Sequence, residues 1–212
     1  MLTALIDYDS GNLHSAHKAF GRMAQESDAG EVVVTDDADV VAKADRVVLP
    51  GDGAFPACRA QLYERTGLFE ALNEAVTIKA RPFMGICVGM QMMATRGLEF
   101  EPTQGLGWVE GDVVQIKPSD PALKVPHMGW NDLIITGEHP VLAGVETGQH
   151  AYFVHSYHLA VTRPDQRLAH VDYGGDVTAI VATENRIGMQ FHPEKSQSTG
   201  LCMISNFLSW AP

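Results

Sequence analysis

The chain has 212 residues, of which 45% are hydrophobic and 19% charged, the ordinary composition of a soluble globular chain with one sizeable core. Its 15 Lys and Arg residues against 26 Asp and Glu residues give a net charge of −11, and no basic run occurs, so we do not expect a nucleic-acid-binding protein. The apolar stretches are too short for a membrane span and no signal-peptide pattern opens the chain, so we expect neither a membrane protein nor an exported one.

The cysteines and histidines give no metal-binding spacing. The three cysteines, Cys58, Cys87 and Cys202, cannot all pair within one chain and match neither a zinc motif nor a CxxC motif. No pair of histidines has the usual H-x₃-H or H-E-x-x-H spacing. We therefore expect a cytoplasmic protein with no metal ion and no cofactor.

The first half of the chain alternates between two kinds of segment. Short apolar runs predict strands at 2–6, 32–34, 46–49 and 82–86. The stretches between them predict helices at 11–25, 36–43 and 55–79, with Asp36 as the N-cap of the second helix. Strands that are apolar throughout, separated by helices, indicate a parallel sheet covered on both faces.

The second half is richer in predicted strands, which are short and separated by Gly, Pro, Asp or Asn. They are expected at 108–116, 131–136, 152–161, 168–173, 177–182 and 187–191. Apolar residues at helical spacing predict a closing helix at 199–210 that packs back on the sheet. No linker divides the chain, so the expectation is a single α/β domain over 1–212, with a doubly wound, mainly parallel sheet and a β-rich second half.

A Gly-x-Cys-x-Gly motif at 85–89 lies between the predicted strand 82–86 and a predicted helical stretch at 90–96. The same arrangement with serine forms the strained nucleophile elbow of hydrolases. A helix N-terminus favours a thiolate, and the N–H of Val88 would point at a developing oxyanion. Cys87 is therefore a candidate nucleophile, although a buried structural cysteine is the alternative.

His192, Pro193 and Glu194 follow the last predicted strand. A thiolate nucleophile needs a base, and Glu194, two residues along an extended chain, can orient the His192 ring. The alternative is a strand-end histidine beside a solvated glutamate. Zinc deaminases also use H-x-E, but no P-C-x-x-C motif follows here.

A Pro-Gly-x-Gly segment at 50–53 follows the third predicted strand. Since the carboxyl ends of neighbouring parallel strands share one edge of the sheet, Gly51, Asp52 and Gly53 should lie beside Cys87. Their N–H groups are candidates for a second oxyanion donor. The segment lacks a Walker lysine and a full G-x-G-x-x-G, so nucleotide binding is only weakly supported.

The order of these three motifs resembles that of the class I, or triad, glutamine amidotransferases. The resemblance implies a flavodoxin-like fold and a Cys-His-Glu triad that hydrolyses the side-chain amide of glutamine through a thioester. It makes Cys87 the nucleophile, His192 the base and acid, and Glu194 the orienting carboxylate.

Four further segments, 9–13, 126–131, 152–157 and 192–196, are similar to the glutaminase subunits of imidazole glycerol phosphate synthases. That resemblance implies a (β/α)₈-barrel cyclase subunit as the partner that takes up the ammonia for histidine biosynthesis. It assigns L-glutamine binding to Gln91, Ser156 and Tyr157. The residues implied at the docking face are Trp130, Tyr152, Lys195 and Asn12.

The sequence also departs from the family pattern. Asp52 stands where the family most often has an apolar residue, Val88 replaces a frequent Leu, and Met90 replaces the His of related glutaminases. Two other interpretations stay open: a glutaminase subunit for anthranilate or pyridoxal phosphate synthesis, and a non-catalytic binding module on the same fold. For an active enzyme, we expect low basal activity until the partner reorganises segment 50–53.

Overall fold

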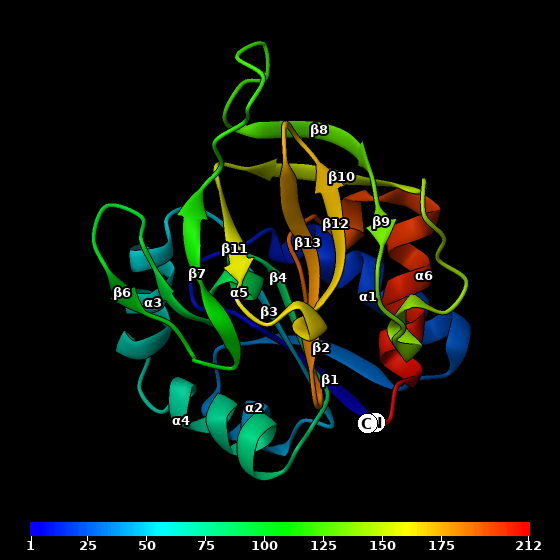
Figure 1. Ribbon diagram of the computed structural model, residues 1–212. Coiled ribbons are helices and arrows are strands. Elements are labelled where there is room, and N and C mark those ends of the chain that lie inside the picture. The colour runs from blue at the N-terminus through cyan, green and yellow to red at the C-terminus, as the bar shows by residue number, and fades with distance from the viewer.

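An eight-stranded mixed sheet forms the centre of the molecule in a computed structural model that describes residues 1–212, and its order is β2-β1-β3-β4-β14-β13-β12-β9 (Figure 1). Its parallel part consists of β1 (Leu2–Ile6), β2 (Glu31–Thr35), β3 (Arg46–Gly51), β4 (Phe83–Cys87) and β14 (Arg186–Met189). Its antiparallel part consists of β13 (Asp176–Thr183), β12 (Arg167–Asp172) and β9 (Ile134–Ile135). The sheet thus changes direction at β14.

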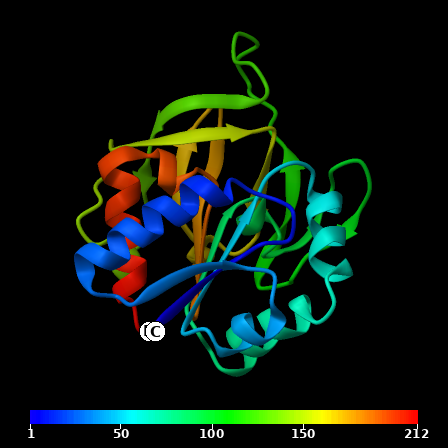
Figure 2. The same cartoon turned by 180° about the vertical axis from the view of Figure 1, so that it is seen from behind.

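Helices cover the parallel part on both faces, which explains why its strands are apolar throughout. Every residue of β3 and β4 is buried. The helices α1 (Leu13–Ser27) and α6 (Gln197–Ser209) pack against each other on one face (Figures 1 and 2). The other side carries α2 (Ala38–Lys43), α3 (Phe55–Glu64) and α4 (Leu68–Asn73), followed by a π-helical turn at Glu74–Ile78.

Two smaller sheets complete the second half. One has the order β11-β7-β5-β6, and its strands are β5 (Ala94–Gly97), β6 (Thr103–Gln104), β7 (Val109–Gln115) and β11 (Tyr157–Val161). The other pairs β8 (His127–Asp132) with β10 (His150–His155) and lies across the end of the large sheet (Figure 1). We name this pair the β8–β10 ribbon.

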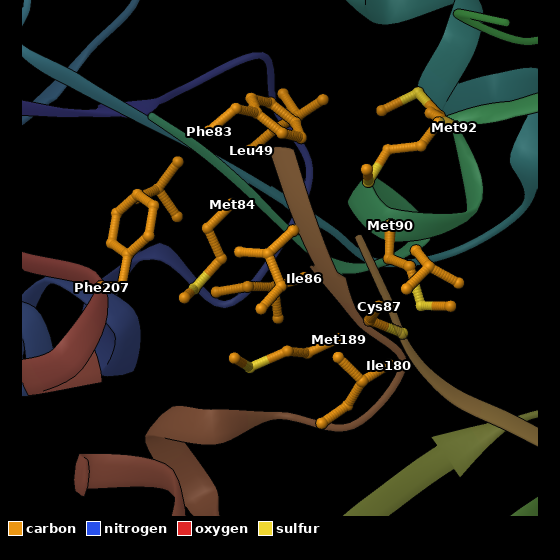
Figure 3. Packing of buried hydrophobic residues seen from close by; sticks show 14 of the residues in the cluster. Leu49, Phe83, Met84, Ile86, Cys87, Met90, Met92, Ile180, Met189 and Phe207 are labelled. Carbon is orange, nitrogen blue, oxygen red and sulfur yellow. The ribbon is translucent and has the colours of Figure 1, made fainter. Parts of the chain in front are cut away.

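The core under the elbow is rich in methionine. Figure 3 shows Met84, Met90 and Met189 around β4 and the short helix α5 (Val88–Gln91), all of them fully buried. Flexible thioether side chains fill irregular gaps well, and such gaps arise where a strand turns abruptly into a helix. Cys87 lies at the edge of this cluster (Figure 3).

Two predicted helices are wrong in their extent. The stretch 55–79 is broken at residues 65–67, because Arg65 is extended and Gly67, which precedes α4, has a φ of +75°, so α3 and α4 are separate. The predicted helix 90–96 ends at Gln91, and residues 94–97 form β5. The N–H groups of Leu106 and Trp108 bond to the carbonyls of residues 92 and 93, a long-range pairing that local sequence does not reveal.

Smaller differences concern caps and strand ends. Asp37, not Asp36, caps α2, because its side chain accepts the N–H of Asp39. The predicted strand 152–161 is two strands separated at Ser156, and the predicted strand 131–136 is replaced by β8 and β9, which are separated at Leu133. The other predicted strands, and the closing helix, occur within two residues of their expected limits.

Candidate active site

The backbone at Cys87 forms a sharp turn between β4 and α5. Cys87 has φ 54° and ψ −113°, a left-handed conformation that a non-glycine residue adopts only at a cost. A Cβ at Gly85 would lie 2.6 Å from the Gly89 carbonyl oxygen, and one at Gly89 would collide with the Leu49 carbonyl. The two glycines of the motif are therefore required by close backbone packing, which holds Cys87 in the wall of a cavity.

His192 and Glu194 form a hydrogen-bonded pair at the end of β14. The His192 Nδ1 atom lies 2.9 Å from Glu194 Oε1, and both side chains are buried. Residues 193–195 form a 3₁₀ turn, so the contact arises from a turn and not from the extended chain that the sequence suggested. The His192 N–H donates to the Tyr152 carbonyl oxygen at 3.0 Å, which fixes this turn to β10.

Sheet topology brings the thiol and the imidazole together. Strands β4 and β14 are parallel neighbours with Ile86 opposite Met189, so the residues that follow them emerge at the same edge. Burial disfavours the charged ring, but hydrogen bonding and charge from Cys87 and Glu194 outweigh it and raise the pKa of His192 to about 10. Because Glu194 occupies Nδ1, it is Nε2 that is available to the sulfur. The imidazole is therefore positively charged at neutral pH beside the Cys87 sulfur.

A cavity of about 240 Å³ opens over the thiol, smaller than the roughly 300–1,000 Å³ of pockets for drug-sized ligands. Its size suits a small metabolite. The lining residues are Asp52, Gly53, Cys87, Val88, Gln91, Glu99, Pro126, Val154, His155, Ser156 and Tyr157.

The four residues predicted as oxyanion donors lie around Cys87, but Gly51 does not line the cavity, whereas the other three do. Val88 begins α5, where N–H groups have no partner inside the helix, and it lines the cavity. Gly51 pairs with Cys87 in the sheet, is buried and does not line the cavity. Gly53 lines it with φ +99°. The Asp52 N–H donates to Ser10 Oγ at 2.9 Å, so in this conformation it is turned to Ser10.

The three predicted substrate residues all line the cavity. Gln91 is buried, and its Nε2 donates to the Tyr157 carbonyl at 2.9 Å and to Gln190 Oε1 at 3.2 Å. Both amide hydrogens are therefore used, and only its Oε1 is left to accept a hydrogen bond from a ligand. Ser156 stands at the break between β10 and β11, where the chain turns over the cavity.

Three polar residues of the site were missed by sequence reasoning, and one of them is His155, which is buried and lines the cavity. Glu99 lines the cavity, and its Oε2 accepts the Phe55 N–H at 2.8 Å, the first N–H of α3. Gln190 is fully buried, and its Nε2 donates to Cys87 Sγ at 3.8 Å. Gln190 stands two residues before His192, and strand alternation could have placed both side chains on one side.

Three of the four residues predicted at a docking face lie together on the β8–β10 ribbon and the turn beside it. Trp130 is 49% exposed and packs edge-on against Tyr152, with ring centroids 5.7 Å apart. Lys195 Nζ lies 6.0 Å from the Tyr152 ring centroid. Asn12 caps α1, and α1 contacts the turn that contains Lys195. The ribbon, whose residues Val154 and His155 line the cavity, thus presents a partly exposed aromatic pair.

The structure contains no group of three or more His, Cys, Asp or Glu side chains placed to hold a metal ion. None of its helices is both long and apolar enough to span a bilayer.

Comparison with known proteins places this site in a family. The family model described as class I glutamine amidotransferase matches residues 4–210. A relative from Ruegeria pomeroyi named imidazole glycerol phosphate synthase subunit HisH is 68% identical over 212 residues, with both chains covered completely. A protein of the same name from Cereibacter sphaeroides is 67% identical, also over the whole of both chains.

Solved structures agree with the predicted fold class. A glutamine amidotransferase superposes with a TM-score of 0.70 at 16% identity, covering 93% of this chain and 94% of that one. A glutamine amidotransferase from Thermotoga maritima gives a TM-score of 0.63 at 17% identity, covering 92% of this chain and 76% of that one. At such identity the likeness speaks for the fold alone, whereas the family model and the relatives cover nearly the entire sequence. This chain belongs to the class I glutamine amidotransferase family.

Proposed function

We propose that this chain is the glutaminase subunit of an imidazole glycerol phosphate synthase, which hydrolyses L-glutamine to glutamate and supplies ammonia to a cyclase subunit. Support for the subunit comes from the full-length relatives of that name at 67% and 68% identity. The observation that carries the chemistry is the buried His192–Glu194 pair at 2.9 Å beside Cys87, which lies in the wall of a small cavity.

The first half of the reaction forms a thioester. The Cys87 thiolate attacks the carboxamide carbon of glutamine, and the negative charge moves to the carbonyl oxygen. The Val88 N–H at the start of α5 is one donor for that oxyanion. As the C–N bond breaks, His192 transfers its proton to the departing nitrogen, and ammonia leaves.

The second half returns the enzyme to its starting state. His192, now neutral, removes a proton from water, and the hydroxide attacks the thioester carbon. Collapse of the tetrahedral intermediate releases glutamate and the Cys87 thiolate beside protonated His192. Glu194 keeps the imidazole in one orientation through both halves and stabilises its charged form.

The cavity offers complementary groups for an amino-acid substrate. The free Oε1 of Gln91 and the second oxygen of Glu99 are acceptors, which suits the α-ammonium group of glutamine. Ser156 and Tyr157 also line the cavity, and the Tyr157 carbonyl accepts the Gln91 amide. Holding the amino-acid end places the side-chain amide over the sulfur.

The second oxyanion donor is not presented in this conformation. Ser10 Oγ accepts the Asp52 N–H at 2.9 Å and donates to the Asp52 carbonyl at 2.8 Å, so a single hydroxyl holds both backbone polar groups of Asp52. Rotation of segment 50–53 would release the N–H toward the cavity. This supports low basal activity until a partner shifts the segment.

Ammonia is protonated in bulk water, so an enzyme that uses it as a nucleophile should receive it in a closed passage. The partly exposed aromatic pair of Trp130 and Tyr152 on the ribbon suits a lasting interface with a (β/α)₈-barrel cyclase. All three cysteines are unpaired, in keeping with a cytoplasmic location.

The test is glutamate release by the chain with and without a candidate cyclase that carries its nucleotide ligand. We expect hydrolysis that rises in the complex, and an anthranilate synthase partner is the negative control. Cys87→Ala should abolish synthesis from glutamine, by about 10⁴-fold or more, while synthesis from added ammonia persists. Loss of both activities would instead assign Cys87 a structural role.

A further inference from the structure

Five polar side chains form a hydrogen-bonded path from β8 to the nucleophile. We call them the buried network; they are Asn131, His127, His155, Gln91 and Gln190. Four of them are at least nine-tenths buried, and only Asn131, on the β8–β10 ribbon, is partly exposed. Buried polar side chains are costly unless they are fully hydrogen-bonded, so an extended set of them calls for an explanation.

The proton positions in the histidine part follow from the carbonyl at its end. His155 Nδ1 lies 2.8 Å from the Tyr157 carbonyl oxygen, which can only accept, so Nδ1 carries the proton. His155 Nε2 is then an acceptor, and His127 Nδ1, at 3.2 Å, must donate to it. His127 Nε2 is left as an acceptor for Asn131 Nδ2 at 3.3 Å.

The orientation of Asn131 is fixed independently. Its Nδ2 also donates to the Asp172 carbonyl at 3.0 Å, and its Oδ1 accepts the Asp132 N–H at 2.8 Å. The direction of donation is therefore the same at every step from Asn131 to the Tyr157 carbonyl. Phe153 and Tyr173 stack on the His127 ring, with centroids 4.8 and 4.0 Å away, and hold its plane.

The glutamine part meets the histidine part at the same carbonyl. Gln91 Nε2 donates to the Tyr157 oxygen at 2.9 Å and to Gln190 Oε1 at 3.2 Å. This leaves the Gln190 amide nitrogen to donate to Cys87 Sγ at 3.8 Å. A donor beside the sulfur restricts the direction in which the Cys87 side chain points.

We propose that the buried network is a positioning device for glutamine hydrolysis: Gln190 orients the Cys87 thiol, and the two histidines fix the Tyr157 carbonyl. Since Asn131 belongs to β8, the network ties the ribbon to both the substrate wall and the nucleophile. The inference rests on the proposed function, because it concerns the geometry of that reaction.

The first test needs no substitution. In ¹⁵N-histidine-labelled protein at pH 7, imidazole ¹⁵N shifts distinguish protonated from unprotonated ring nitrogens. We expect His127 and His155 to be neutral, each with its proton on Nδ1. A proton on Nε2 of either ring would overturn the assignment of the network, whatever the activity of the enzyme.

The second test separates the two ends of the network by steady-state kinetics of the complex with the cyclase. Asn131→Asp keeps the shape but removes the donor to His127, and we expect KM for glutamine to rise by about fivefold with little change in kcat. Gln190→Met removes the donor to the sulfur, and we expect kcat to fall by about 10-fold to 100-fold.

The matched control is Asp132→Asn, the next residue of β8, whose side chain is exposed. It should leave KM and kcat unchanged. A wild-type complex that hydrolyses glutamine while Asn131→Asp and Gln190→Met behave like this control would refute the positioning role and leave the proposed function intact. An inactive wild-type complex would count against the proposed function itself, and the ¹⁵N shifts would still decide the network.

Discussion

The Cys87 turn and the His192–Glu194 pair are held in place by different means. We call them the nucleophile side and the base side of the site. On the nucleophile side, Gly85 and Gly89 bring backbone against backbone, and a Cβ at either position would overlap a carbonyl group or other main-chain atoms. On the base side, side-chain hydrogen bonds hold the residues in position. The His192–Glu194 bond is the clearest example, and Ser196 Oγ donates to the His192 carbonyl at 2.7 Å.

This difference determines how each side responds to substitution and to the docking of a partner. Backbone packing leaves no room for adjustment, so the nucleophile side should tolerate almost no substitution. Hydrogen-bonded side chains can shift by small amounts, and the base side is connected to the β8–β10 ribbon through the Tyr152 carbonyl. A docked partner can therefore act on the base side and the pocket wall while the Cys87 turn stays fixed.

The largest effect is expected from a methyl group on the nucleophile side. Gly89→Ala places a Cβ against the Leu49 carbonyl, and we expect the free energy of unfolding to fall by about 3–5 kcal/mol, measured by urea denaturation. Gly21→Ala is the control, since a Cβ there meets nothing within 4 Å inside α1, and it should stabilise by about 0.5–1 kcal/mol. Equal changes in the free energy of unfolding for the two substitutions would show that close backbone packing does not hold the nucleophile side in place.

Lowering the pH from 7 to 5 should reduce the free energy of unfolding, because two buried histidines of the network stay neutral in the folded protein. Burial lowers the pKa of His127 to about 4 and of His155 to about 3, whereas both rings titrate near 6.5 when unfolded. Between pH 7 and pH 5 the unfolded chain gains these protons and the folded chain does not, so the free energy of unfolding should fall by about 2 kcal/mol for each ring.

His155→Gln isolates one of these contributions. Its free energy of unfolding should change less between pH 7 and pH 5 than that of the wild type, by about 2 kcal/mol. Identical pH dependence in the two proteins would show that the ring is not held neutral in the folded state.

Loss of an exposed aromatic residue on the ribbon should weaken docking. Trp130→Ala is expected to raise the Kd for the cyclase by roughly 30-fold, measured by calorimetry, because large aromatic residues carry much of the energy of interfaces. Phe100→Ala is the control: that ring is 86% exposed, but it lies between β5 and β6, which belong to a different sheet from the ribbon. If Phe100→Ala had the larger effect, the docking face would lie elsewhere.

The smallest effect concerns segment 50–53. Ser10→Ala removes the hydroxyl that holds the backbone N–H and carbonyl of Asp52, and we expect basal glutamine hydrolysis without a partner to rise by roughly fivefold. Ser27→Ala, which removes a hydroxyl bonded to the Met23 carbonyl, should leave the rate unchanged. A lower basal rate in Ser10→Ala would mean that this hydroxyl supports the active conformation.

Sequence patterns predicted the parallel strands and the neighbourhood of the site well, since both depend on local composition and on the order of βαβ units. Apolar runs located β1 to β4, and the parallel order placed Gly51 opposite Cys87. The prediction that failed near the site was the helix at 90–96. Its end depends on hydrogen bonds from residues 106 to 109, which no local pattern contains.

The hydrogen-bonded part of the site was harder to predict for the same reason. Gln190, Glu99 and His155 acquire their positions from partners more than 30 residues away or from the break at Ser156. From the sequence, such residues can be recognised only as polar groups in or near a strand. Their orientation is set by tertiary contacts.

The most direct test of the central claim is mass spectrometry of the complex after reaction with a glutamine analogue that carries an electrophilic ketone. We expect one covalent adduct per chain, on Cys87, suppressed by excess glutamine, with Cys58 and Cys202 unmodified. A stoichiometric adduct on Cys58 or Cys202, or none on Cys87 in an assembled complex, would contradict that claim.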